Sequence, residues 1–116
     1  MLLIDNKVVE HVLNMSECIA AQEAAFASLL TGGAIGRPRI DMYVPCDQDN
    51  GYYRYGSVEG TSDGILAVRL KSDILVWPKA EGKAGSEQKF CIKPGTYCGL
   101  VFLINTGRGD PLALLN

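Results

Sequence analysis

The chain has 116 residues, which corresponds to one domain at roughly 150 residues per domain. It carries 11 basic and 13 acidic residues, and 47% of its residues are hydrophobic, which excludes a disordered chain. A pI of about 5.3 argues against a strongly basic nucleic-acid-binding protein. Neither a membrane span nor a secretion signal is evident. We therefore expect one cytoplasmic domain over residues 1–116, with neither nucleic acid nor a membrane as partner.

The four cysteines, at positions 18, 46, 91 and 98, do not have the spacing of a metal site. No two of them form a Cys-x-x-Cys pair, and the single histidine, His11, is far from all of them in sequence. Two disulfides are arithmetically possible, but the composition favours reduced thiols over a secreted, cysteine-rich scaffold. We expect no bound metal.

The first third of the chain predicts a short strand and two helices. A strand at residues 2–4 precedes a short helix that Asp5 or Asn6 can cap, because their side chains accept hydrogen bonds from unpaired backbone N–H groups. Ser16 predicts the start of a longer helix in the same way. A pair of glycines after Thr31 is expected to end this helix.

Beyond the helices the apolar residues alternate with polar ones, which is typical of strands with one covered face. A turn-rich segment separates the first two of these runs and indicates a hairpin. The expected strands are residues 39–44, 52–58, 65–71, 99–104 and 112–115, with strand or loop at 73–77 and a polar loop at 79–89. The predicted fold class is α+β, with two amino-terminal helices packed on a mixed, largely antiparallel sheet of about five or six strands.

The run Leu100–Ile104 contains no polar residue, so both faces of that strand should be covered. Two helices are little material for covering a sheet of this size on both sides. We therefore expect a homodimer or a higher homo-oligomer.

The basic residues of the predicted sheet are the most informative cluster in the sequence: Arg37, Arg39, Arg54, Arg69 and Lys71. Arg69 and Lys71 are two residues apart and project to the same face of a strand. Two such cations repel each other unless an anion, a carboxylate such as Glu59 or Asp73, or solvent offsets them. The residues alone leave two interpretations open, a solvated or internally paired strand and a pocket that binds a carboxylate.

The tripeptide Arg108–Gly109–Asp110 matches an adhesion motif. It lies between two predicted strands in a glycine- and proline-containing segment, so we interpret it as a turn.

Several short motifs, taken in order, are similar to those of a known family. They are Gly36–Arg39, Tyr55–Gly60, Leu66–Asp73, Pro94–Leu103 and Gly109–Leu115. In this order and spacing the chain resembles the amino-terminal half of the ornithine cyclodeaminase/mu-crystallin family, and the likeness spans nearly all 116 residues.

The resemblance implies the substrate-binding and dimerisation half of an NAD(P)-dependent enzyme. In such enzymes a Rossmann domain with a Gly-x-Gly-x-x-Gly fingerprint follows this half, and no such fingerprint occurs in the chain. We therefore expect that NAD or NADP serves the full-length protein, that residues 1–116 bind no cofactor alone, and that they are inactive alone.

The resemblance also implies roles for individual residues. Arg39 matches the arginine that receives the substrate α-carboxylate. Arg69 stands where most members have lysine, and because arginine stays charged, Lys71 is the alternative acid or base. Arg69 and Lys71 are thus the candidate catalytic residues, and the candidate substrate-binding residues are Arg39, Arg54 and Glu59.

The implied substrate is a small amino acid or a cyclic imine, which undergoes deamination or imine reduction in lyase or oxidoreductase chemistry. Val58–Gly60 replaces the Met-Pro segment of the family, which argues against ornithine itself. The alternative is a non-catalytic, self-assembling α+β binding module.

Overall fold

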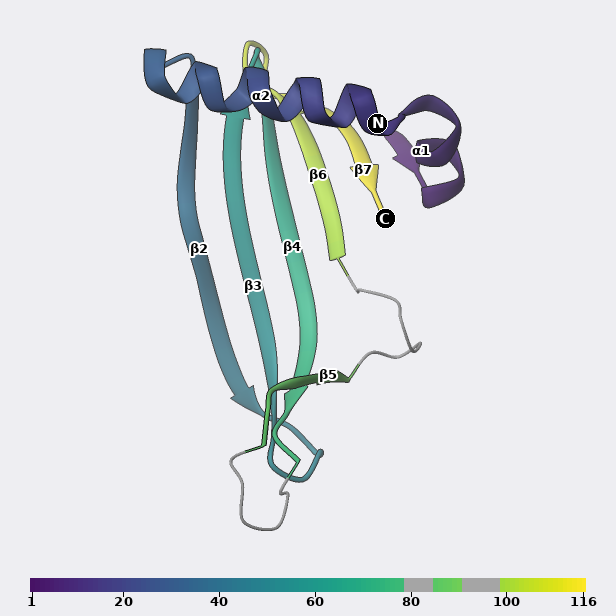
Figure 1. Ribbon diagram of the computed structural model, residues 1–116, viewed down its shortest axis with the longest axis vertical. Coiled ribbons are helices and arrows are strands. Elements are labelled where there is room, and N and C mark those ends of the chain that lie inside the picture. The colour runs from purple at the N-terminus through teal and green to yellow at the C-terminus, as the bar shows by residue number, and fades with distance from the viewer. Residues whose placement is uncertain (79–84, 91–98) are drawn as a thin grey trace.

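The computed structural model describes residues 1–78, 85–90 and 99–116 and places two helices beside one sheet (Figure 1). The helices are α1 (Asn6–Val12) and α2 (Met15–Thr31), and the strands are β1 (Leu2–Ile4), β2 (Ala34–Pro45), β3 (Gly51–Ser62), β4 (Ile65–Val76), β5 (Gln88–Phe90), β6 (Gly99–Asn105) and β7 (Pro111–Leu115). The strand order is β1-β7-β6-β4-β3-β2, and β5 pairs with β4. The predicted α+β class is confirmed.

The sheet is mixed, because β1 runs parallel to β7 while the other pairs are antiparallel. It has seven strands among the described residues, one more than the upper estimate. The additional strand is β5, which lies inside the segment predicted to be a polar loop. Residues 79–84 of that loop lie outside the described part of the chain.

Both helices begin at a side-chain cap. The Oδ1 atom of Asp5 accepts a hydrogen bond from the backbone N–H of Val8 at 3.0 Å, as expected for the start of α1. At α2 the prediction of Ser16 as cap is wrong, since Asn14 and Glu17 form a reciprocal capping box with both hydrogen bonds at 3.0 Å. This motif places an acid three residues after the cap, which fits Asn14 and leaves Ser16 inside the first turn. Gly32 ends α2 in the left-handed conformation, as predicted.

The three longest strands, β2, β3 and β4, form an antiparallel meander of twelve residues each. The tight turn at Asp63 and Gly64 joins β3 to β4 with positive φ at both residues, which suits the right-handed twist of the strands. Strand β4 continues to Val76, so the segment at 73–77 left open as strand or loop is mainly strand.

The segment between β6 and β7 is a turn, as predicted for Arg108–Gly109–Asp110. The Oδ1 atom of Asn105 accepts hydrogen bonds from the backbone N–H groups of Gly107 and Arg108 at 2.9 and 3.0 Å. The Arg108 side chain pairs with Asp110. These contacts stabilise the turn and explain why Arg108, Gly109 and Asp110 follow one another here.

The register gives the sheet two chemically different faces. In β4, Arg69, Lys71 and Asp73 alternate with Val68 and Leu70, so the charged and apolar side chains point in opposite directions. We call these the charged face and the apolar face. This confirms the predicted alternation in the third strand.

Helix α2 crosses the strand ends where β2 begins (Figure 1). Ala25 and Leu29 of the helix border a groove whose floor includes the small residues Ala34, Gly60 and Ala67. Small side chains there allow the helix to approach the sheet. The helix therefore covers only one end of the charged face, and the charged side chains lie further along the same strands.

Little of the apolar face is covered by the described residues. Ile40 and Met42 of β2 are 55% and 56% exposed, and Leu100 of β6 is 37% exposed. The large hydrophobic side chains of a soluble domain normally pack against a partner layer. The expected second cover for β6 is therefore not supplied by the described part of this chain.

None of the helices described is both long and apolar enough to cross a membrane. Within residues 1–78, 85–90 and 99–116, no group of three or more His, Cys, Asp or Glu side chains could hold a metal ion. Cys18 and Cys46 are free thiols. Cys91 and Cys98 lie outside the described residues, as does part of the motif at 94–103.

Candidate functional site

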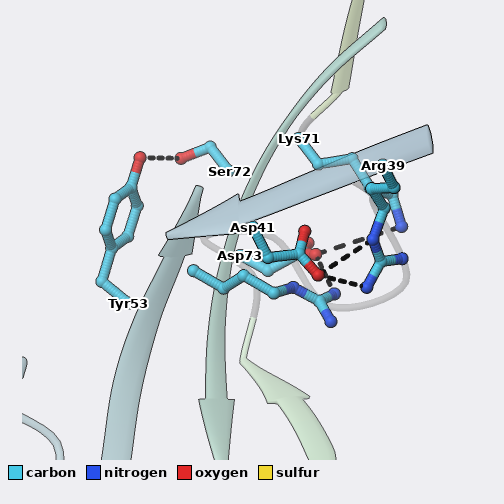
Figure 2. A network of polar contacts seen from close by, with 7 residues as sticks. Arg39, Asp41, Tyr53, Lys71, Ser72 and Asp73 are labelled. Carbon is cyan, nitrogen blue, oxygen red and sulfur yellow. Dashed lines mark hydrogen bonds and ion pairs between the residues drawn. The ribbon is translucent and has the colours of Figure 1, made fainter. Parts of the chain in front are cut away.

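The pairing of β2, β3 and β4 gathers charged side chains from all three strands on the charged face. One cross-strand row contains Asp41, Gly56 and Lys71, and the next contains Arg54 and Asp73 beside Tyr43 of β2. In Figure 2, Arg39, Asp41, Lys71 and Asp73 point toward one another, whereas Tyr53 and Ser72 lie apart from them. Side chains that are distant in sequence thus form one polar cluster.

Arg54 and Asp73 form the buried centre of this cluster. Their closest nitrogen and oxygen are 2.7 Å apart, and the side chains are 7% and 0% exposed. The hydrogen bond to Asp73 raises the pKa of Arg54, against the opposing effect of burial, and a hydrogen bond to the Tyr43 hydroxyl adds to it. Arg54 is therefore a cation held in place, and its guanidinium is largely shielded from solvent.

Arg39 reaches the cluster because β2 is irregular between Arg37 and Ile40. The extra residue there places Arg39 on the same face as Asp41, while Arg37 points to the other side. Two guanidinium nitrogens of Arg39 donate to one Asp41 oxygen at 2.9 and 2.6 Å. About half of the Arg39 side chain stays exposed, so its remaining N–H groups face solvent.

The close approach of Asp41 depends on a glycine. The Oδ1 atom of Asp41 lies over Gly56 of β3, in the space that a Cβ at position 56 would occupy. A side chain at 56 would therefore displace the carboxylate that holds Arg39. Gly56 is itself buried.

Lys71 lies beside this cluster, with its amine 4.0 Å from Asp73. Burial lowers the pKa of Lys71, the nearby positive charges of Lys89 and Arg69 lower it further, and Asp73 opposes this shift. Its side chain is 16% exposed. A lysine in these surroundings gives up its proton more easily than one in water, which suits an acid or a base.

Arg69 shares the charged face with Lys71 but is more exposed. Its row of the sheet contains Val58 and Val101. Among the described residues Arg69 has no carboxylate in salt-bridge contact. Its guanidinium is thus available for an anion.

Two oxygens of the cluster are buried without a hydrogen-bond donor among the described residues. They are the Oδ1 atoms of Asp41 and Asp73. A buried acceptor without a donor costs about 1–3 kcal/mol. The two carboxylates are therefore held here by the cations around them, at some cost to stability.

Glu59 is not brought to this cluster. It is an odd-numbered residue of β3 and so points away from Arg54, to the apolar face. There it pairs with Arg37 at 2.5 Å, and this hydrogen bond lowers the pKa of Glu59. Its predicted role in substrate binding stays a prediction, and four of the five candidate residues share one face.

Sequence reasoning did not single out Asp41 and Lys89 as residues of the charged face. The alternation predicted for residues 39–44 assigned Asp41 to the same side as Arg39, but it did not identify Asp41 as a site residue. Lys89 could not be assigned to a side in this way, because its position depends on the pairing of β5 with β4, where it lies opposite Leu75.

Neither a protein-family model nor a curated protein sequence matches the chain. Solved structures do match. The iminosuccinate reductase of Paracoccus denitrificans, solved with NAD⁺, is 18% identical with a TM-score of 0.69, over 99% of this chain and 31% of that one. A probable ornithine cyclodeaminase from Bordetella pertussis Tohama I is 15% identical with a TM-score of 0.67, over 100% of this chain and 30% of that one.

An archaeal alanine dehydrogenase dimer with bound NAD is 23% identical, with a TM-score of 0.67 over 99% of this chain and 30% of that one. At these identities the likeness concerns the fold. The predicted resemblance to ornithine cyclodeaminases is thereby confirmed at the level of fold. The whole chain has a fold that occupies about 30% of these larger proteins.

Proposed function

We propose that the chain is the substrate-binding and dimerisation part of a larger NAD(P)-dependent enzyme that acts on an amino acid or a cyclic imine. The observation that carries this proposal is the convergence of Arg39, Arg69 and Lys71 on one face of the sheet. The fold shared with an iminosuccinate reductase, a probable ornithine cyclodeaminase and an alanine dehydrogenase supports the same kind of reaction.

The cations of the charged face divide into two roles in this proposal. Arg69 and the exposed edge of Arg39 bind the substrate carboxylate, since a guanidinium can donate two parallel hydrogen bonds to it. Lys71 exchanges a proton with the substrate, because its surroundings favour the neutral amine more than water does. Arg54 acts indirectly by fixing Asp73, which lies 4.0 Å from the Lys71 amine.

The described residues do not fit a dinucleotide. Such a cofactor binds at a glycine-rich turn that leads from a strand into a helix. The glycines at 32 and 33 follow helix α2 and lead into β2, which is the reverse order. We therefore assign hydride transfer to none of the described residues, and we propose that NAD or NADP is held by another part of the enzyme.

The apolar face is proposed to form the dimer interface. Ile40, Met42 and Leu100 leave large apolar surfaces exposed on one side of the sheet, opposite the charged side chains. A second copy would cover them and leave the charged face open for substrate.

The test is the substitution Arg69→Ala in the protein, with Arg108→Ala as a matched control in the β6–β7 turn. Loss of a charge-assisted hydrogen bond should weaken carboxylate binding by about 1–3 kcal/mol, whereas the control should bind as the wild type does. Isothermal titration with a panel of amino acids and cyclic imines measures the effect. Equal affinities for wild type and Arg69→Ala would remove Arg69 from the site.

The internal pairing of Arg39 with Asp41 and Arg54 with Asp73 favours a second candidate, a self-assembling module without chemistry. In that case these charges serve only the structure of the sheet. Such a module would bind none of the panel, so the same titration separates the two functions.

A further inference from the structure

The Arg39 guanidinium is held along one edge and leaves another edge open. Its Nε and Nη2 atoms donate to the same Asp41 oxygen, at 2.9 and 2.6 Å. A guanidinium carries five N–H groups, and this contact takes two of them. The pair at the outer end, one N–H from Nη1 and one from Nη2, stays available, since Asp41 is the only described residue that accepts a hydrogen bond from Arg39. These two N–H groups are parallel and match the two oxygens of a carboxylate.

The outer end of Arg39 is accessible from solvent, whereas Asp41 lies behind it. The Arg39 side chain is 48% exposed and that of Asp41 is 17% exposed. In Figure 2 the dashed hydrogen bonds lie on the side of Arg39 that faces Asp41. A ligand carboxylate can therefore reach the outer end of the guanidinium without displacing the Asp41 carboxylate.

Asp41 is itself fixed from its other side. Its Oδ1 atom is buried, accepts no hydrogen bond from the described residues, and lies against Gly56 of β3. Asp41 and Gly56 are direct partners in the pairing of β2 with β3. A Cβ at position 56 would overlap with Oδ1, so the carboxylate has room only because residue 56 is glycine.

Stability alone does not account for a carboxylate at position 41. A buried acceptor without a donor costs about 1–3 kcal/mol, and an apolar side chain would avoid that cost. The charge of Asp41 also attracts Arg54, but Asp73 already holds Arg54 by a hydrogen bond at 2.7 Å. Exceptions to the usual rules of packing are expected at functional sites. The contact that distinguishes Asp41 is the one with Arg39.

We propose that Asp41 is a positioning residue, which holds the inner edge of Arg39 so that the outer edge faces the substrate carboxylate, and that Gly56 provides the space for it. The inference rests on the proposed function, because it takes Arg39 as a residue that binds the substrate. It adds two residues to the site, neither of which touches the substrate.

The first measurement is the affinity for L-alanine and L-proline by isothermal titration. Asp41→Ala and Gly56→Ala should each weaken binding about tenfold, because both release Arg39 from its fixed orientation. Two matched controls should bind as the wild type does. Asp110→Ala removes the acid of the second Arg-x-Asp pair, in the β6–β7 turn. Gly60→Ala adds a Cβ on the same face of β3, where it meets the Ile35 backbone oxygen at an ordinary 3.6 Å.

Double substitutions show whether the three residues act through one series of contacts. Gly56→Ala added to Asp41→Ala should change the affinity less than about twofold, since the carboxylate with which its Cβ overlaps is gone. Asp41→Ala added to Arg39→Ala should likewise have no further effect. Additive losses in both pairs would mean that Asp41 and Gly56 affect binding by a route other than Arg39, and the inference would be wrong.

Nuclear magnetic resonance of protein labelled with ¹⁵N-arginine separates the two edges of the guanidinium. In wild type the Arg39 Nε–H should exchange slowly with water both with and without L-proline, because Asp41 keeps its hydrogen bond. L-Proline should shift only the Nη signals of Arg39. Faster exchange at Nε on adding L-proline, or tighter binding by Asp41→Ala, would mean that Asp41 competes with the ligand and does not position Arg39.

Two further outcomes separate this inference from the proposed function. Binding that depends on Arg69 but is unchanged in Asp41→Ala and Gly56→Ala would overturn the positioning role alone. Failure of every amino acid and cyclic imine of the panel to bind wild type would overturn the proposed function and the positioning role with it. Circular dichroism of each variant shows that the fold is retained.

Discussion

The contact between Arg54 and Asp73 is the most buried interaction between charged side chains that the structure describes. Both side chains are nearly inaccessible to solvent, and Asp73 also lies near Lys71. Removing one partner of a buried pair leaves the other charge without compensation, which costs far more than the loss of an exposed pair. Asp73 therefore stabilises the fold through its pair with Arg54, and it also influences the charge state of the nearby Lys71 amine.

We expect Asp73→Asn to lower the free energy of unfolding by about 3–5 kcal/mol, because it leaves the Arg54 guanidinium buried without its carboxylate. Chemical denaturation followed by circular dichroism measures this. Asp63→Asn in the exposed β3–β4 turn is the control and should change stability little, since asparagine also tolerates a positive φ. A loss below about 1 kcal/mol for Asp73→Asn would mean that the pair is not a structural anchor.

Lys71 gives the protein a pH dependence with a defined sign. Its pKa is below the ordinary value of 10.5 in the fold, so between these two values the unfolded chain holds a proton that the folded chain has released. The contribution of Lys71 to the free energy of unfolding therefore increases as the pH rises through this interval. Lys71→Gln should remove that increase.

Unfolding experiments on wild type and Lys71→Gln across this interval, with Lys7→Gln as control, test the prediction. Nuclear magnetic resonance titration of the dimethylated lysines measures the pKa directly. A Lys71 pKa at or above the ordinary lysine value of 10.5 would contradict the assignment of Lys71 as an acid or base.

At the level of elements, the sequence predicted what depends on local period. The alternation in β4 assigned Arg69 and Lys71 to one face without knowledge of any partner strand, and the structure agrees. The small, polar strand β5 has no such alternation, and its formation depends on β4 as a template. Hence Lys89 could not be placed beside Lys71 from sequence alone.

The capping of α2 is a second case in which spacing decided the outcome. Asn14 and Ser16 are both good capping residues, but only Asn14 has an acid three positions later. The start of α2 was therefore predicted better by the three-residue spacing to Glu17 than by the residue type of the cap alone.

We expect Asn14→Ala to destabilise the protein by about 0.5–2 kcal/mol, because the backbone N–H of Glu17 at the start of α2 loses the side-chain oxygen that accepts its hydrogen bond. Ser16→Ala, two residues further on, should have an effect within about 0.5 kcal/mol. Thermal unfolding of both variants makes the comparison. Equal destabilisation by the two substitutions would argue against Asn14 as the cap.

At the scale of the whole molecule, the two sides of the sheet differ in their chemistry. The charged face holds the candidate site, and the apolar face leaves Ile40, Met42 and Leu100 exposed. The alternation of residues along the strands was sufficient to predict that the sheet has a charged face and an apolar face. The sequence of this chain does not predict what covers the apolar face, because that depends on the surface of whichever copy or domain packs against it.

A lysine placed in the proposed interface should prevent the proposed dimer from forming. We expect Met42→Lys to convert the protein from dimer to monomer at micromolar concentration, because burying an unpaired charge against an apolar surface is costly. Asp49→Lys, in the turn between β2 and β3, is the control and should leave the dimer intact. Light scattering after size exclusion gives the mass, and an unchanged mass for Met42→Lys would exclude this face as the interface.

The irregular step in β2 has a further consequence for how this surface can change. Arg37 and Arg39 would point the same way in a regular strand, but the extra residue between them sends one to each side. Deleting Pro38 would restore the regular pleat and leave each arginine on its present side, because neighbouring residues of a regular strand point to opposite faces. A single-codon deletion could therefore straighten the edge strand while keeping one positive charge on each side of the protein.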